Sequence, residues 1–237
     1  LYQGEGKKKW NYNTDIGIAV EKLRQVIESI SEVIYKELFK VALAAILLDV
    51  SNLYRNGKCL SYKKKWEDRK IVEKDVFDKF DEKVLKELKC DIENSITRTK
   101  INNKERLYNQ DSRIGIANEV DDNSIDLVIT SPPYLNSRDY TDTYMLELKT
   151  LGFTKTSEEI KELREKTLRS HVQIKWNDTS NVNNELLENT LVELEEASKE
   201  IEKWNDSIID MVRLYFVDMQ NIFRVLYGKM KIHGRIY

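Results

Sequence analysis

The segment Ser131-Pro132-Pro133-Tyr134 combines groups that suit the recognition of an aromatic amine. Ser131 has a hydroxyl that can accept a hydrogen bond, Pro132 offers a backbone carbonyl, and Tyr134 offers an aromatic face on which a flat heterocycle can stack. Because each proline lacks an N–H and restricts the residue before it to extended conformations, the segment is a stiff arm whose carbonyls can face a ligand. Two acceptors and a ring are the groups needed to hold a nucleobase by its exocyclic amino group.

The residues before this arm predict a buried strand that stops abruptly. Residues 126–130, Asp-Leu-Val-Ile-Thr, form a β-branched run that lies between the polar turn 121–124 and the two prolines. Pro132 and Pro133 are the only two prolines of the chain. Their placement at a strand end indicates that the backbone shape at this point is fixed.

A second strand is expected over residues 106–109, ending at Asp111. The two strands are close in sequence, which favours neighbouring positions in a parallel α/β sheet, where ligands bind outside the carboxyl ends of the strands. Asp111 and Ser131 both follow such ends. The alternative for Asp111 is a turn or helix cap, and the alternative for 131–134 is a rigid exit from the sheet without chemistry.

Residues 122–134, Asp-Asn-Ser-Ile-Asp-Leu-Val-Ile-Thr-Ser-Pro-Pro-Tyr, resemble the catalytic motif of S-adenosylmethionine-dependent DNA amino-methyltransferases. These enzymes methylate N4 of cytosine or N6 of adenine. Serine at the first motif position is more typical of the cytosine-N4 members, and Asp or Asn of the adenine-N6 members. The resemblance extends over 107–153, with a weaker match over 215–237.

The resemblance implies an α/β fold, part of a Rossmann-like methyltransferase sheet with large helical additions. It also implies S-adenosylmethionine as cofactor, DNA as partner, a restriction-modification or related defence setting, and a cognate restriction or defence protein as a further partner. The residues it implies are catalytic Ser131, Pro132, Pro133 and Tyr134, and cofactor-binding Asp111 and Thr130. No metal is implied.

Other functions remain open from the sequence. They are adenine-N6 methylation of DNA, methylation of RNA or of a protein amide, and a non-catalytic helical DNA-binding or interaction module. The chain lacks the glycine-rich Phe-x-Gly-x-Gly loop with which such enzymes approach the cofactor. We therefore expect a fragment of a longer enzyme.

Composition restricts the function classes. Lys+Arg number 39 and Asp+Glu 41, giving a net charge of -2, which argues against a purely electrostatic DNA binder. Cys59 and Cys90 are too few for a disulfide framework, and the two histidines, His171 and His233, do not suit a zinc site or a Ser/His/Asp triad. With neither a signal peptide nor a membrane-spanning stretch visible, a reducing cytoplasm is expected.

Periodicity predicts four regions along the chain. They are a mainly helical region over 1–100, the catalytic-motif part of the core over 101–153, a helical insertion or target-recognition-like region over 154–205, and a helix and strand returning to the core over 206–237.

Within the first region, one helix is expected from Thr14 and another from Asp75. The apolar stretch 41–48 predicts the most deeply buried helix of the chain, which Asn56-Gly57 would end. Residues 58–70 mix lysines and arginine with Tyr62 and Trp66. This stretch suits either a DNA-facing loop or a solvated linker.

Overall fold

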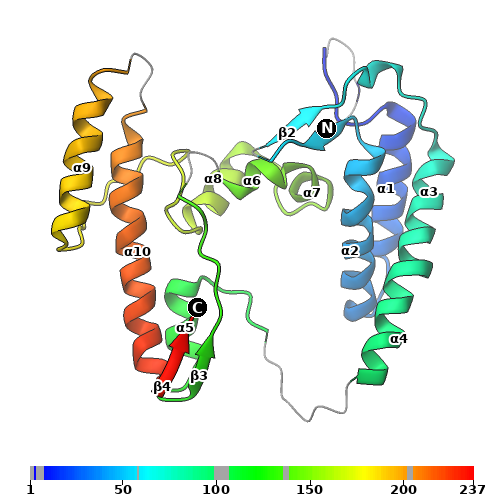
Figure 1. The fold of residues 1–237 in the computed structure, drawn as a ribbon. Coiled ribbons are helices and arrows are strands. Elements are labelled where there is room, and N and C mark those ends of the chain that lie inside the picture. Colours follow the sequence, from blue (N-terminus) through cyan, green and yellow to red (C-terminus); the bar gives the residue numbers. More distant parts are fainter. Residues whose placement is uncertain (1–2, 4–7, 58, 99–106, 136–138, 202–204) are drawn as a thin grey trace. The chain divides into compact units, whose positions relative to one another are not determined.

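The computed structural model of the chain describes all residues except 1–2, 4–7, 58, 99–106, 136–138 and 202–204 (Figure 1). Contacts divide the chain into two compact units, and each unit contains two stretches of sequence. Unit 1 comprises 1–105 and 140–156, and unit 2 comprises 106–139 and 157–237. Among the described residues, no helix combines the length and apolar character needed to cross a bilayer.

Three long helical segments form the body of unit 1. They are α1 (Thr14–Glu28), α2 (Val33–Val50), and α3 (Glu73–Glu82) continued through the π-helical turn η2 (Lys83–Leu88) into α4 (Lys89–Arg98). The helix predicted from Thr14 is confirmed, with Asn13 as its N-cap. The helix predicted from Asp75 is also confirmed and begins two residues earlier. Asp75 accepts a hydrogen bond from the Val72 N–H at 2.9 Å, which stabilises the helix start.

The core of unit 1 lies between these helices. Its fully buried side chains include Ile16 and Val20 of α1, Leu43 and Leu47 of α2, and Val76 of α3. The expectation that α2 is the most deeply buried helix is wrong. Its outer side exposes Val33, Ile34, Tyr35 and Val41, because only one side of α2 faces the core.

A small antiparallel hairpin follows α2. Its strands are β1 (Leu53–Arg55) and β2 (Leu60–Tyr62), and the short helix η1 (Trp66–Asp68) comes next. The prediction that Asn56-Gly57 ends α2 is wrong, because the helix ends at Val50 and Gly57, with φ of +87°, lies in the hairpin loop. Asn-Gly is common both at the C-terminal ends of helices and in hairpin loops, so the dipeptide alone does not distinguish the two.

Two short helices from later in the sequence also belong to unit 1. These are α6 (Tyr140–Thr143) and α7 (Met145–Thr150). Leu146 is fully buried in the core, and the Tyr12 hydroxyl and the Thr150 Oγ1 lie 3.3 Å apart. Arg55 of the hairpin forms an ion pair with Glu147 of α7. These contacts join the 140–156 stretch to the first hundred residues.

Unit 2 contains four helices and a two-stranded parallel sheet among its described residues. The helices are α5 (Ser112–Glu119), α8 (Ser157–Glu165), α9 (Glu185–Ser198) and α10 (Ser207–Lys229), and the strands are β3 (Ile125–Val128) and β4 (Met230–Ile236). In Figure 1, α9 and α10 run side by side, and α10 leads directly into β4 beside β3. The C-terminal strand predicted from the sequence is therefore present.

In the parallel pair of β3 and β4, Ile125 lies opposite Met230 and Val128 lies opposite Ile236. The register is irregular between Ile125 and Leu127. The strand predicted over 106–109 is wrong for its described residues, since 107–109 form no strand and the parallel neighbour of β3 is β4. Leu107 is 98% exposed, so no packing holds this segment in a sheet. The mixture of helices and small sheets agrees with the α/β class, although the described residues are mostly helical.

The fully buried Leu43 provides a test of the unit 1 core. We expect Leu43→Ala to lower the free energy of unfolding by about 3 kcal/mol, because it leaves a cavity among packed side chains. The matched control is Leu85→Ala, since Leu85 is 64% exposed and its truncation should cost less than about 1 kcal/mol. Urea denaturation followed by circular dichroism measures both, and equal effects would contradict this assignment of the core.

Candidate functional site at the end of strand β3

The Ser131-Pro132-Pro133-Tyr134 segment follows directly after the last hydrogen bonds between β3 and β4. The Tyr237 N–H donates to the Val128 carbonyl and the Thr130 N–H donates to the Tyr237 carbonyl, both at 2.9 Å. The next residues are Ser131 and two prolines without an N–H, so pairing cannot continue in the same manner. Thr130 is thus the last residue held by the sheet, and the four candidate catalytic residues form the chain that leaves it.

The side chains of this segment differ in exposure. Ser131 is exposed, Pro132 and Pro133 are half-buried, and Tyr134 is 77% exposed. The hydroxyl and the aromatic ring are therefore accessible to a ligand. The two prolines between them limit the conformations that the segment can adopt.

The expectation that β3 is a buried strand is wrong for this structure. Leu127 is 51% exposed and Ile129 is 79% exposed, whereas Ile125 and Val128 are half-buried. Within the described residues, β3 is paired along one edge only. Because alternate side chains of a strand point to opposite faces, Leu127 and Ile129 lie on the same face. One face therefore lacks a covering layer in the part of the chain that the structure describes.

Asp111 caps a helix in the structure. It is the N-cap of α5, and its Oδ1 accepts a hydrogen bond from the Arg113 N–H at 2.9 Å. The Arg113 guanidinium also contacts both carboxylate oxygens, with Nη2 2.6 Å from Oδ2. These hydrogen bonds hold the pKa of the Asp111 carboxyl below its ordinary value. Among the described side chains, Asp111 bonds to Arg113 and not to the 131–134 segment.

Arg113 connects Asp111 to a buried carboxylate that the sequence reasoning missed. Asp218, in the middle of α10, has 3% side-chain exposure and lies 3.3 Å from Arg113 Nη1. It also accepts hydrogen bonds from the Arg169 backbone N–H at 3.1 Å and from Arg169 Nη2 at 2.7 Å. Arg169 in turn pairs with Asp178. This network ties α5, α10 and the irregular segment after α8 together.

The sequence contains one weak indication of this network. Asp218 stands between Val217 and Met219 on an otherwise apolar helix face, and a charge in such a position requires a partner. Its partners are 49 and 105 residues away in sequence. A single sequence gives no means of selecting them.

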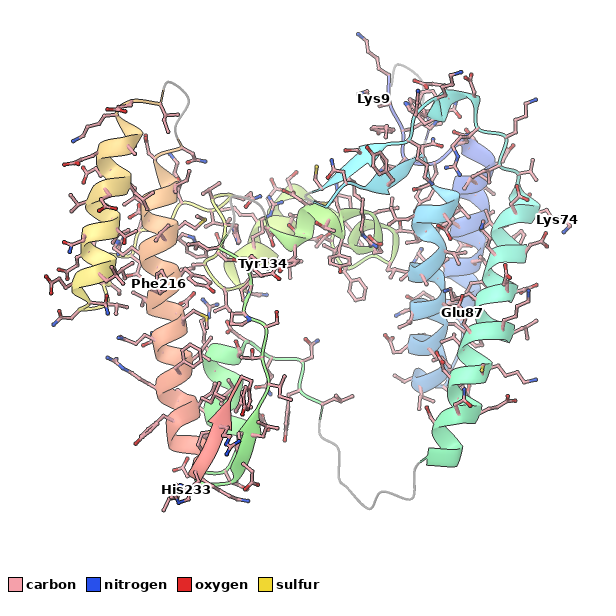
Figure 2. The ribbon with its side chains drawn as sticks, in the orientation of Figure 1. Lys9, Lys74, Glu87, Tyr134, Phe216 and His233 are labelled. Carbon is pink, nitrogen blue, oxygen red and sulfur yellow. The ribbon has the colours of Figure 1, made fainter. Side chains whose placement is uncertain are left out.

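A groove of about 620 Å³ is lined by Pro132 and by residues of α9 and α10. Its walls are mainly apolar and include the aromatic rings of Tyr215, Phe216 and Phe223, with the amide of Gln220 among them. In Figure 2, the segment that carries Tyr134 passes beside α10, which carries Phe216. The groove therefore adjoins the motif segment within unit 2.

The described residues contain no group of three or more His, Cys, Asp or Glu side chains placed to hold a metal ion.

The amino-acid sequence is similar to those of known methyltransferases. The chain is 30% identical over 240 residues to the Type II methyltransferase M.BsoBI of Geobacillus stearothermophilus, covering 85% of this chain and 47% of that protein. It is 30% identical over 247 residues to the Type II methyltransferase M.AvaI of Nostoc sp. (strain PCC 7120), covering 91% of this chain and 49% of that protein. The chain is homologous to Type II DNA methyltransferases.

This homology confirms the resemblance inferred from residues 122–134. The M.AvaI of Anabaena variabilis matches to the same extent. The chain spans about half the length of these methyltransferases. No family model and no solved structure matches the chain.

The Asp218 network gives a stability prediction for unit 2. We expect Asp218→Asn to lower the free energy of unfolding by about 3 kcal/mol, because two arginines lose their buried counter-ion. Asp122→Asn is the matched control: Asp122 also forms an ion pair, with Lys229, but its side chain is 74% exposed, so the change should be within about 0.5 kcal/mol. Urea denaturation compares the two, and an equal effect would show that burial of Asp218 is unimportant.

The Asp111–Arg113 pair predicts a pH dependence. Because its folded-state pKa is lowered, Asp111 contributes stability above the unfolded pKa of about 3.9, and this contribution is lost as the pH falls through the folded-state pKa. The difference in unfolding free energy between the unmodified protein and Asp111→Asn should therefore be largest near neutral pH and shrink below about pH 4. Denaturation curves across pH 2.5–7 measure it, and a constant difference would rule out the ionised pair.

Proposed function

We propose that the protein transfers a methyl group from S-adenosylmethionine to the exocyclic amino group of a base in DNA, with cytosine N4 as the first choice and adenine N6 as the second. The observation that carries the proposal is the position of Ser131-Pro132-Pro133-Tyr134 at the end of a parallel strand, with the hydroxyl and the ring exposed. Homology to Type II DNA methyltransferases supports the reaction class. Ser131 supports cytosine, by resemblance to the N4 members.

The proposed mechanism begins with the electronic state of the amine. The lone pair of an exocyclic amino group is delocalised into the aromatic ring, so the nitrogen is a poor nucleophile until its geometry becomes more tetrahedral. Ser131 Oγ and the Pro132 carbonyl would accept hydrogen bonds from the two amino protons and favour that geometry. Pro133 would keep the two acceptors in fixed relation, and Tyr134 would stack on the base.

The transfer forms an N–CH₃ bond as the S–CH₃ bond of the donor breaks, and the nitrogen gives up one proton to solvent. Type II DNA methyltransferases use S-adenosylmethionine as the methyl donor, which supplies an electrophilic methyl group on a sulfonium. We assign Asp111 and Thr130 to its binding. The fit rests on the ionised Asp111 carboxylate, which keeps acceptor lone pairs while bound to Arg113, and on the place of Thr130 at the last bond of the sheet.

The target base must leave the duplex to reach the motif. The groove beside Pro132 has aromatic and amide side chains, and its volume of about 620 Å³ exceeds that of a single base. We propose that the extruded base enters at this end of the groove. The stacking of bases on aromatic side chains supports this use of Tyr215, Phe216 and Phe223.

We further propose that β3, α10 and β4 are part of a Rossmann-like methyltransferase sheet. The parallel pairing of β3 with β4, joined through a connection that contains α10, supports this assignment. The biological setting proposed is restriction-modification, with a cognate restriction or defence protein, in the cytoplasm where chromosomal DNA is available. The Type II designation of the relatives supports that setting.

The test measures incorporation of a tritiated methyl group into DNA oligonucleotides by the protein and its variants. We expect Ser131→Ala and Tyr134→Ala each to lower the rate by about 100-fold, because the first removes an acceptor for the amino protons and the second removes the ring on which the base stacks. Tyr227→Ala serves as the matched control, since Tyr227 is an aromatic residue that is 83% exposed and lies outside the motif and the groove, so its rate should be unchanged.

Full activity in both motif variants would refute the assignment of residues 131–134. RNA oligonucleotides of the same sequence provide the second arm. Methylation of RNA in place of DNA would instead identify an RNA methyltransferase. Analysis of the methylated nucleosides separates cytosine N4 from adenine N6.

A further inference from the structure

Unit 1 carries a group of basic residues that the reaction proposed for unit 2 does not use. They lie in the segment before α1 and around β2 and η1. The structure sorts these residues into two classes that the sequence cannot distinguish. One class binds within the protein and the other faces solvent.

Lys63 and Arg69 belong to the internal class. The Lys63 ammonium donates to the carbonyls of Leu48 at 2.7 Å and Ser51 at 2.9 Å, and Arg69 Nη2 donates to the Asp49 carbonyl at 3.1 Å. These carbonyls lie at and just beyond the last turn of α2, where a cation is favourable. Lys63 and Arg69 are therefore occupied in capping the C-terminal end of α2.

The other class consists of exposed lysines without an acidic partner among the described residues. We call Lys8, Lys9, Lys64, Lys65 and Lys70 the lysine surface. Lysines along the helices of the same unit behave differently, because most of them form ion pairs. The lysines paired with acidic side chains are Lys22, Lys36, Lys40, Lys74, Lys83, Lys86 and Lys89. Among the described residues of unit 1, the exposed lysines without an acidic partner therefore lie before α1 and around β2 and η1.

An aromatic cluster brings the two parts of the lysine surface together. The rings of Trp10 and Trp66 meet edge to face with centroids 4.8 Å apart, and Tyr62 lies 5.1 Å from Trp66. Lys9 Nζ lies 5.3 Å from the Tyr62 ring centroid. Figure 2 shows Lys9 at the end of unit 1 where β2 lies, away from Glu87 on the helices. Trp66 is only 6% exposed, so it supports this surface and does not stack on a base.

Lys65 adds a backbone observation. It has φ of 53° in the left-handed region, which is unfavourable for a residue with a Cβ and clusters at functional positions. Lys65 directly precedes η1, and the backbone changes direction there. Lys64 and Lys65 are exposed, whereas the next residue, Trp66, is buried. The exposed acids Glu67 and Asp68 lie nearby and reduce the positive charge without cancelling it.

We propose that the lysine surface binds the phosphate backbone of DNA. The inference rests on the proposed function, which makes DNA the substrate, and it assigns the sequence-independent part of DNA binding to unit 1. The ammonium groups of exposed lysines can bind phosphate oxygens of DNA, and this binding releases the counterions condensed on the DNA. The chain has a net charge of -2, so this local surface supplies an attraction that the overall charge does not.

The experiment measures the affinity for a duplex of about 25 base pairs as a function of salt concentration, without methyl donor. The variant combines Lys8→Gln, Lys64→Gln and Lys70→Gln with Lys65→Asn, since asparagine tolerates the left-handed conformation. We expect the slope of log Kd against log salt to fall by about 0.9 for each phosphate that the variant no longer binds. The matched control also removes four lysines, but ones that are paired with acidic side chains, and it should leave the slope unchanged. It combines Lys22→Gln, Lys74→Gln, Lys86→Gln and Lys89→Gln.

Several outcomes separate this inference from the proposed function. If the unmodified protein methylates DNA and the variant keeps its affinity and salt slope, the lysine surface does not bind DNA and the inference is wrong. If the control variant is weakened as much as the test variant, the effect is general and the inference is also wrong. If the unmodified protein neither binds nor methylates DNA, the proposed function fails and the inference fails with it. Thermal unfolding of each variant checks that the fold is retained.

Discussion

The absence of a backbone N–H at two consecutive residues is the constraint on which the candidate site depends. Pairing between β3 and β4 continues to Thr130, and Pro132 and Pro133 have no N–H with which to extend a ladder of hydrogen bonds. The polypeptide must leave the sheet as an extended arm. Ser131 and Tyr134 are exposed on this arm, and Pro132 also lines the groove between α9 and α10.

A second constraint is the burial of Asp218 in α10. A carboxylate with 3% side-chain exposure needs charged partners, and it obtains them from Arg113 and Arg169. Arg113 also holds Asp111, so the residue assigned to the cofactor is connected to the helix that forms one wall of the groove. Asp111 and α10 are thus joined by one electrostatic network within unit 2.

Local patterns predicted several elements of the fold. The helix from Thr14 and the helix that contains Asp75 follow from hydrophobic periodicity and capping residues, and the structure contains both. The C-terminal strand was also expected, although its pairing partner β3 is distant in sequence. The motif at 131–134 was likewise visible because its residues are consecutive. Asp111 was identified as a candidate, but its role as a helix cap and its arginine partner depend on the fold. The catalytic and cofactor roles of these residues remain predictions.

The errors arose where a contact with another segment of the chain decides the structure. Asn56-Gly57 has the chemistry of both a helix end and a hairpin turn, and the pairing of Leu53 with Tyr62 decides between them. Residues 107–109 have strand-like composition but no strand to pair with among the described residues. The basic stretch 58–70 could not be divided into capping and exposed residues without the position of the α2 carbonyls.

The unpaired edge of β3 affects how the protein behaves in concentrated solution. The carbonyl of Val128 and the N–H of Thr130 both bond to Tyr237, so the peptide groups of Ile129 point to the other edge, where no described strand pairs with them. An open edge that carries the exposed side chains of Leu127 and Ile129 is a template for strand addition between molecules. This edge would therefore favour concentration-dependent association of the protein.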